Sequence, residues 1–230
     1  MTTLQVHDLT VARGAGPVIT GVDFRLEPGK ITALVGPNGA GKTSTLEAVS
    51  GVLPAARGNI TLGGIDITRH SRVARARLGV AHVEQGRTVF GGLTTLENIR
   101  LTARTAADVE EMLALFPELD KRKDAPAALL SGGEQQMVVL ARAFAAKPAF
   151  LLIDEMSLGL APAVFTRLLP VVTRFTEAGA AVLLVEQFTH LALGVAQDAV
   201  VVASGRVTYA GDAGTLLDSP ATLHSAYLGE

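Results

Sequence analysis

A glycine-rich segment between an apolar run and a helix constrains the fold of this chain more than any other feature. Residues 31–35 (ITALV) form a short, nearly continuous apolar run, which is typical of a strand buried on both faces. Residues 36–43 (GPNGAGKT) follow at once with the spacing G-x-x-x-x-G-K-T, and the helix-compatible residues 43–50 end at Gly51. The order of strand, glycine-rich loop and helix predicts an α/β core whose loop surrounds a phosphate group.

The loop carries the groups that a nucleoside triphosphate requires. Its glycines let consecutive backbone N–H groups turn toward phosphate oxygens, and the helix N-terminus adds a partial positive charge. Lys42 can reach the β- and γ-phosphates, and the hydroxyl of Thr43 can ligate Mg²⁺. The alternative is an ordinary glycine-rich turn between a strand and a helix, which the flanking pattern disfavours.

The remaining apolar patterns predict how the chain is organised around this unit. Residues 150–153 and 182–185 are apolar runs followed by polar residues and helical periodicity, which indicates βα repeats around a parallel sheet. The first thirty residues alternate apolar and polar side chains, as antiparallel strands do, and residues 199–209 predict a hairpin with a short helical tail after it. Residues 94–129 carry apolar side chains at helical spacing and predict a helical insert.

Composition narrows the class of protein. Of 230 residues, 48% are hydrophobic and 18% charged, which is typical of a packed globular chain rather than a disordered one. A formal net charge of −2 argues against a general nucleic-acid binder. The absence of cysteine excludes disulfides and cysteine-ligated metal sites. Neither a secretory signal nor an apolar run of the ~20 residues that a membrane span needs is found, so we expect any membrane role to depend on partners.

An acidic pair follows one of the apolar runs. Asp154 and Glu155 come directly after residues 150–153, at the strand exit where βα folds hold their ligands. Asp154 is predicted to orient Mg²⁺, and Glu155 to polarise the water that attacks the γ-phosphate. On its own, such a pair more often consists of acidic residues that interact favourably with the N-terminus of a helix, but its occurrence with the phosphate loop favours the catalytic interpretation.

A second glycine motif lies far along the chain from the first. Residues 130–136 (LSGGEQQ) precede a helix predicted over residues 137–146, and Ser131 and Glu134 have the spacing of a capping box. The alternative is simply a well-capped helix. In the functional interpretation, the two glycines leave the helix N-terminus open to an anion, so one nucleotide would contact both motifs only across two chains or after a large rearrangement.

The order of phosphate loop, helical insert, LSGGEQQ and LLIDE resembles that of the ATP-binding cassette (ABC) family over essentially the whole chain. The resemblance implies a P-loop NTPase fold, with a RecA-like parallel-sheet core and an N-terminal antiparallel β subdomain. Residues 1–230 would form one cassette with a helical subdomain inserted at about residues 88–135. It also implies an ATPase that couples hydrolysis of ATP with Mg²⁺ to solute transport across a membrane.

The same resemblance implies roles for individual residues. In the family, two cassettes pair head to tail, and the signature motif of one closes on the γ-phosphate bound by the other. The expected signature residues are Ser131, Gly132, Gly133 and Glu134. The expected magnesium residues are Thr43, Gln85 and Asp154, and the expected catalytic residues are Glu155 and Gln187. The expected nucleotide-binding residues are Arg13, Gly36, Pro37, Asn38, Gly39, Ala40, Gly41, Lys42, Thr43 and Ser44.

The implied partners are a second cassette, identical or different, two transmembrane permease subunits and, indirectly, an extracytoplasmic solute-binding protein, but no nucleic acid. The chain would then be peripheral at the cytoplasmic face of the inner or plasma membrane. Residues 84–90, 157–162, 184–187 and 225–229 are similar to one of the two cassettes of branched-chain amino acid importers. Alternatives are a related importer for urea or amides, a lipid exporter, a non-transport cassette serving DNA repair or the ribosome, and a clamp that binds ATP but scarcely hydrolyses it.

Four positions depart from the family pattern. Arg13 occupies the place of an aromatic residue that stacks on adenine, a role that a planar guanidinium can also fill, although a solvated arginine is the alternative. Gln187 replaces a histidine that contacts the γ-phosphate and cannot become a cation. Met156 replaces a proline, and Leu160 an aspartate that commonly reaches across the dimer. These changes suggest an altered hydrolysis rate.

A basic cluster comprises Arg69, Arg72, Arg75 and Arg77. A patch for anionic lipid or nucleic acid is one interpretation. The spacing favours the other, the solvated face of a helix with Val73 and Leu78 turned inward.

Overall fold

The computed structural model describes residues 2–14, 16–86, 88–157 and 162–229. The strands are β1 (Leu4–Arg13), β2 (Gly16–Leu26), β3 (Ile31–Val35), β4 (Arg57–Leu62), β5 (Ile65–Asp66), β6 (Val80–Val83), β7 (Phe150–Asp154), β8 (Ala181–Val185), β9 (Asp198–Ala203) and β10 (Arg206–Asp212). The helices are α1 (Lys42–Ser50), α2 (Arg72–Arg77), α3 (Thr95–Arg100), α4 (Ala106–Leu115), α5 (Pro117–Asp120), η1 (Ala127–Leu129), α6 (Gly132–Ala145), α7 (Pro162–Glu177), α8 (Thr189–Val195), α9 (Ala213–Asp218) and α10 (Pro220–Leu228).

A six-stranded sheet in the order β10-β9-β3-β8-β7-β6 forms the centre of the molecule. Its strands are parallel except β10, which returns antiparallel to β9 as the predicted hairpin. Every residue of β3, β7 and β8 is buried, as their continuous apolar runs require. The predicted α/β fold with a parallel-sheet core is therefore confirmed.

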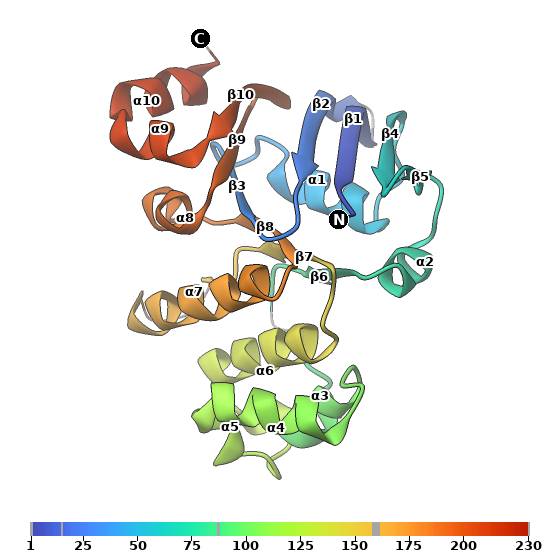
Figure 1. The fold of residues 1–230 in the computed structure, drawn as a ribbon, viewed down its shortest axis with the longest axis vertical. Helices are drawn as coiled ribbons and strands as arrows, with labels where there is room; N and C mark the ends of the chain where they lie inside the picture. Colours follow the sequence, from blue (N-terminus) through green and yellow to red (C-terminus); the bar gives the residue numbers. More distant parts are fainter. Residues whose placement is uncertain (1, 15, 87, 158–161, 230) are drawn as a thin grey trace.

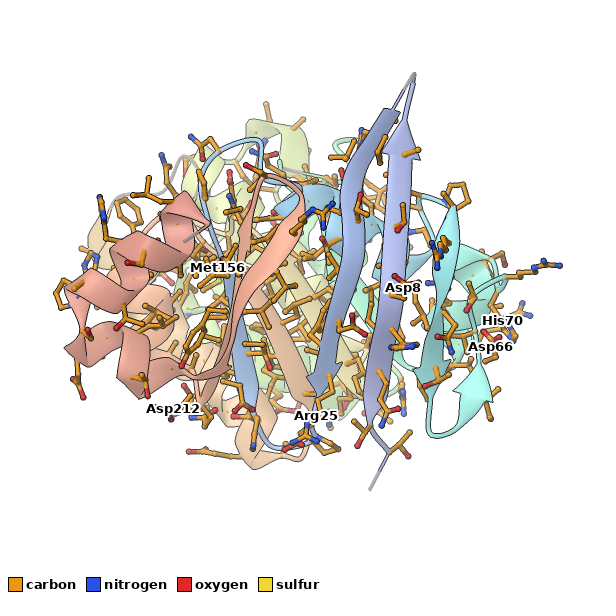
Figure 2. All side chains as sticks on the ribbon, turned by 90° about the horizontal axis from the view of Figure 1, so that it is seen from above. Asp8, Arg25, Asp66, His70, Met156 and Asp212 are labelled. Carbon is orange, nitrogen blue, oxygen red and sulfur yellow. The ribbon has the colours of Figure 1, made fainter. Side chains whose placement is uncertain are left out.

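Alternate residues of the central strands face two separate hydrophobic cores, because successive side chains of a strand point to opposite faces. Leu151 and Ile153 of β7 pack in a core with α6, α7 and α8, whereas Phe150 and Leu152 pack in a core with α1 and the N-terminal strands. Met156 belongs to the first core and lies inside the molecule, while Asp66 and His70 lie at its edge (Figure 2). The phosphate loop thus starts from a strand that is fixed on both faces.

A second, antiparallel sheet in the order β2-β1-β4-β5 covers α1 (Figure 1). It confirms the antiparallel strands predicted from the alternation in the first thirty residues. The strands β4, β5 and β6 were not predicted. β5 is only two residues long, and β6 is a half-buried edge strand whose four residues carry no strong pattern.

Helices α3 to α6 gather at the end of the molecule opposite the antiparallel sheet (Figure 1). Residues 94–129 contain α3, α4, α5 and η1 and no strand, as predicted, although the limits of an inserted subdomain at about 88–135 stay a prediction. Helix α6 begins at Gly132 rather than at residue 137, because the side chain of Ser131 caps it and the two glycines form its first turn. Among the described residues, no helix is both long and apolar enough to cross a membrane.

The predicted orientation of the arginine-rich helix α2 is wrong. Val73 is 61% exposed and Leu78 38% exposed, whereas Arg75 is 1% exposed. The Arg75 guanidinium donates to the carbonyl oxygens of Ala48 and Val49, which end helix α1. Hydrogen bonds to helix-terminal carbonyls outweigh the burial of two apolar side chains here, a preference that the spacing of charges does not reveal.

Candidate nucleotide-binding and catalytic site

The phosphate loop connects the buried end of β3 to the N-terminus of α1, as the motif predicts. Gly36 has a φ of 147°, and a Cβ atom there would lie 2.0 Å from the carbonyl oxygen of Val202. Gly41 precedes α1 with a φ of 106°, and a Cβ atom there would lie 2.3 Å from Cγ2 of Ile19. Because only glycine fits both places, the backbone N–H groups of the loop are held in a fixed turn at the start of the helix.

Lys42 lies inside this loop. Its side chain is 8% exposed, and Nζ donates to the carbonyl oxygens of Gly36 at 2.8 Å and Pro37 at 2.9 Å. Burial lowers the pKa of Lys42, and the nearby carboxylates of Glu155 and Asp154 oppose that shift. The ammonium group is therefore placed at the loop by bonds to main-chain carbonyls.

Asp154 ends β7 as a buried carboxylate. Its exposure is 1%, and neither side-chain oxygen makes a hydrogen bond of ordinary geometry to any residue in the described part of the chain. Burial raises its pKa to about 6, while the nearby Thr43 hydroxyl and the Lys42 charge act in the opposite direction. A buried carboxylate without a donor is destabilising on its own and favours a cation as its partner.

Glu155 follows with its carboxylate turned toward Gln85. Nε2 of Gln85 donates to Oε2 of Glu155 at 2.8 Å, although 70 residues separate them in sequence. Glu155 has a φ of 48°, a left-handed conformation that non-glycine residues adopt only when their surroundings fix it. The backbone N–H of Glu155 is bonded to the carbonyl oxygen of Val185 at 3.0 Å, so β8 fixes this turn from one side.

These groups share one cleft of about 440 Å³. It is lined by Val18, Asn38, Gly39, Gly41, Lys42, Thr43, Ser44, Gln85, Glu155 and Gln187. The cleft therefore brings together the loop, the general-base candidate, Gln85 and Gln187, whereas Gly36, Pro37, Ala40, Asp154 and Arg13 are not among its lining residues. Val18 is an apolar wall that no sequence motif indicated.

A larger groove of about 1070 Å³ lies elsewhere, between α4 to α6 and α7. Its lining is mostly apolar, including Phe116, Phe144 and Phe175, and it lies beside the residues that precede β7 and β8. Ligands of parallel α/β sheets bind at the opposite, carboxyl ends of the strands. The chemistry therefore belongs to the smaller cleft.

Arg13 is tethered to helix α1. Its Nε donates to Oγ of Ser44 at 3.2 Å, and its Nη2 forms an ion pair with Glu47. Both partners lie in the first two turns after the phosphate loop. Contact of Arg13 with adenine stays a prediction.

The signature residues are separate from the cleft. Ser131 caps α6 through a capping box: its N–H donates to Oε2 of Glu134 at 2.7 Å, and the N–H of Glu134 donates to Oγ of Ser131 at 3.3 Å. None of Ser131, Gly132, Gly133 and Glu134 is among the described residues that line the cleft. The capping-box prediction is confirmed, and the role toward a nucleotide stays a prediction.

Two departures from the family pattern have different outcomes. Met156 is fully buried in the core beside Glu155. Leu160 lies outside the described residues.

The sequence patterns assigned no role to Glu186, which is 2% exposed and bonded to Ser157. The signal was present, since Glu186 follows the buried run of β8 as Asp154 ends that of β7.

Comparisons with known proteins agree with this arrangement. Residues 19–157 match the ABC transporter family. The chain is 36% identical to the high-affinity branched-chain amino acid transport ATP-binding protein BraG of Pseudomonas aeruginosa, over 90% of this chain and 91% of that protein. It is 30% identical to the lipopolysaccharide export system ATP-binding protein LptB of Escherichia coli K12, over 100% and 98%. A solved ATP-binding subunit of an ABC transporter shares the fold with a TM-score of 0.85 and 28% identity, covering 98% of both chains.

The family match spans more than half of the chain, and both relatives are similar over nearly their whole length. Their names give different transported substrates, so the similarity shows an ABC transporter ATPase and does not decide which substrate this chain serves. The chain therefore belongs to the ABC transporter family, in which it is an ATP-binding and ATP-hydrolysing motor subunit.

Proposed function

We propose that the cleft at the ends of β3 and β7 binds ATP with Mg²⁺ and hydrolyses it with Glu155 as general base, to power import of branched-chain amino acids. The observation that carries the proposal is the gathering of Lys42, Gln85 and Glu155 around one cleft, with the buried carboxylate of Asp154 near Lys42. Phosphates would be bound by backbone N–H groups of the loop and by Lys42.

The residues fit a magnesium ion. Asp154 offers a buried carboxylate that makes no hydrogen bond of ordinary geometry to the described residues, and the Thr43 hydroxyl lies near enough to lower its pKa. Gln85 donates to Glu155 through its amide nitrogen, and its amide oxygen makes no hydrogen bond within the described part of the chain. Carboxylate, hydroxyl and amide oxygens are the ligands that Mg²⁺ takes, together with water and phosphate oxygens. When bound, the ion supplies positive charge to the β- and γ-phosphates.

Glu155 is suited to activate water. Gln85 donates to its Oε2, and among the described residues no hydrogen bond occupies Oε1, which can therefore accept a proton. Gln187 lines the same cleft and can donate a hydrogen bond toward the γ-phosphate, but it cannot supply a cation. We infer that charge stabilisation in the transition state depends on Lys42 and on the metal ion rather than on Gln187.

The site is proposed to be completed by a second cassette. The capped N-terminus of α6 is open to an anion, yet Ser131 and Gly133 do not line the cleft of their own chain within the described residues. A head-to-tail pair would bring this surface to the γ-phosphate held by the neighbour. ATP would then bind between the cassettes, and hydrolysis would release them.

The membrane partners are proposed to dock beside Gln85. Three exposed apolar side chains lie in or next to the helical region that follows Gln85: Phe90 at 54%, Leu101 at 52% and Leu129 at 70% exposure. The backbone N–H of Ala128 bonds to the carbonyl oxygen of Gly91 at 3.2 Å, so the segments that carry Phe90 and Leu129 run together. Exposed apolar side chains on adjacent segments fit a permease helix, and Gln85, five residues before Phe90, would connect that contact to the cleft.

The choice of solute rests on likeness. Identity to the branched-chain amino acid cassette BraG is 36%, against 30% for the lipopolysaccharide export cassette LptB. The sequence segments around Gln85 and Gln187 favour the amino acid importers as well. A urea or amide importer and a lipid exporter are the alternatives.

Two substitutions test the proposed chemistry. Glu155→Gln should reduce the rate of phosphate release at least a hundredfold while leaving ATP affinity within threefold, because it removes the base and keeps the bond from Gln85 possible. Lys42→Ala should instead weaken ATP binding itself, since the cation contacts phosphate in the ground state. The exposed His190→Ala serves as control. Phosphate release that survives Glu155→Gln at the normal rate would contradict the assignment.

A further inference from the structure

Glu186 is a buried carboxylate to which the proposed chemistry assigns no role. It follows the last residue of β8 and precedes Gln187, which lines the cleft. Its exposure is 2%, and burial raises its pKa to about 7, although hydrogen bonds from Ser157 and the Gln187 backbone lower it in part. A buried acid of this kind weakens the fold by its desolvation, so stability alone does not account for a glutamate here.

Each carboxylate oxygen of Glu186 accepts a hydrogen bond from Ser157. Oε1 accepts from the backbone N–H of Ser157 at 3.2 Å, and Oε2 accepts from the Ser157 hydroxyl at 2.5 Å. Ser157 is itself 6% exposed and lies two residues after Glu155. The pair therefore ties the loop that follows β7 to the loop that follows β8.

The tie is placed where the backbone requires it. Glu155 has a left-handed φ of 48°, which costs about 1 kcal/mol or more for a residue with a side chain. On its N-terminal side, Asp154 is fixed in the sheet opposite Val185, and the N–H of Glu155 bonds to the Val185 carbonyl oxygen. On its C-terminal side, the buried Met156 and the two bonds from Ser157 to Glu186 hold the turn.

We propose that Glu186 is a positioning residue for ATP hydrolysis, which locks the strained turn of Glu155 to the loop of Gln187 so that both side chains face one γ-phosphate. This inference rests on the roles proposed above for Glu155 and Gln187. Glu186 does not contact the nucleotide. It acts through Ser157, and its removal should alter the rate of the chemical step more than the affinity for ATP.

Three variants of the full chain test the inference. Glu186→Leu should lower kcat for ATP hydrolysis at least tenfold, with the dissociation constant for ATP within threefold of the parent, because the phosphate loop is intact. Glu186→Gln should restore kcat to within threefold, since its amide can accept from the Ser157 N–H and donate to the Ser157 hydroxyl oxygen. Glu177→Leu makes the same exchange at an exposed position at the end of α7 and should behave like the parent.

A double-mutant cycle isolates the contact. Ser157→Ala removes the hydroxyl and keeps the backbone N–H, so it should reduce kcat less than Glu186→Leu does. In the Glu186→Leu background, Ser157→Ala should have no further effect, because its partner is gone. Independent, multiplicative losses would overturn the proposed link.

The remaining outcomes are also decisive. Unchanged kcat in Glu186→Leu, while Glu155→Gln is inactive, would overturn the positioning role alone. Equal losses in Glu186→Leu and Glu186→Gln would show that hydrogen bonding to Ser157 is not the mechanism. A parallel collapse of kcat, ATP affinity and melting temperature in both Glu186 variants would indicate a purely structural residue. Full turnover in Glu155→Gln would remove the group being positioned and would overturn both proposals.

Discussion

Replacing Arg75 by alanine should destabilise the fold severely, although sequence spacing assigns this residue to a solvated surface. Its side chain makes four hydrogen bonds to main-chain carbonyl oxygens: Nη1 to Ala48 at 2.6 Å and Val49 at 2.7 Å, Nη2 to Thr68 at 2.7 Å, and Nε to His70 at 3.1 Å. It thereby fastens the C-terminus of α1 to the segment between β5 and α2. Burial lowers the pKa of Arg75, which reflects the desolvation that these bonds offset.

The magnitude follows from the bonds and the burial. Each hydrogen bond from a charged donor contributes about 1.5–3 kcal/mol net, so four would exceed the desolvation of one guanidinium, which is several kcal/mol. Alanine would also leave carbonyl oxygens without donors and open a cavity. We expect the free energy of unfolding to fall by about 3–5 kcal/mol, a large fraction of the about 5–15 kcal/mol typical of a domain.

Urea unfolding followed by circular dichroism measures this loss. Arg77→Ala, two residues away on the exposed face of the same helix, is the matched control and should change the free energy of unfolding by about 0.5 kcal/mol or less. Arg75→Lys should recover only part of the loss, because one ammonium group cannot reach carbonyls on opposite sides of a planar fork. A loss below about 1 kcal/mol in Arg75→Ala would refute the argument, since four real bonds cannot be removed so cheaply.

Three further predictions follow from the site. Gly36→Ala should destabilise the fold by about 3 kcal/mol or more in thermal melts, because its Cβ would meet the Val202 carbonyl, whereas Gly194→Ala, with open space around it, should be neutral. Asp154→Asn should raise the free energy of unfolding at pH 8 without nucleotide by up to about 3 kcal/mol, which is the equivalent of a pKa raised from 3.8 to about 6. The same variant should lose the increase in ATP affinity that Mg²⁺ gives the parent. Lower stability together with normal magnesium dependence would contradict the assignment of Asp154. The pKa of Glu186 is raised from 4.5 to about 7, so between these pH values the folded state keeps a proton that the unfolded state has lost, and the contribution of Glu186 to stability falls as pH rises. The free energy of unfolding of Glu186→Gln relative to the parent should therefore grow between pH 5 and pH 8, by up to about 3 kcal/mol. A difference in urea titrations that stays constant with pH would exclude this linkage.

The central sheet and the phosphate loop were predictable because their signals are local. Residues 31–35, 150–153 and 182–185 are buried on both faces, which leaves a continuous apolar run in the sequence. The loop spacing is equally local, since its glycines, Lys42 and Thr43 all lie within residues 36–43. The reason for glycine at position 36 is not local, because a Cβ atom there would clash with the carbonyl oxygen of Val202 in β9. The pairing of Gln85 with Glu155 could be expected only through the family resemblance, because 70 residues separate them.

What the sequence concealed depends on contacts between distant elements. Arg75 looks like its neighbours Arg72 and Arg77 in any pattern of charge, and only the nearby end of α1 distinguishes it. The start of α6 was misplaced because glycines are poor helix formers, and the cap at Ser131 outweighs that intrinsic preference. The tether of Arg13 to Glu47 likewise joins β1 to α1 across more than thirty residues.

The two buried acids at the ends of β7 and β8 differ in their hydrogen-bond partners. Asp154 and Glu186 are both nearly inaccessible, and burial raises the pKa of both. Glu186 accepts two hydrogen bonds from Ser157, whereas Asp154 makes no hydrogen bond of ordinary geometry to the described residues. Both acids therefore carry a desolvation penalty, but the oxygens of Glu186 are bonded to Ser157, whereas those of Asp154 are left for a ligand. If Mg²⁺ binds at the proposed site, it offsets the desolvation of Asp154, and this adds to the affinity for the metal–nucleotide complex. The same buried charge that destabilises the isolated cassette therefore strengthens the binding of ATP with Mg²⁺.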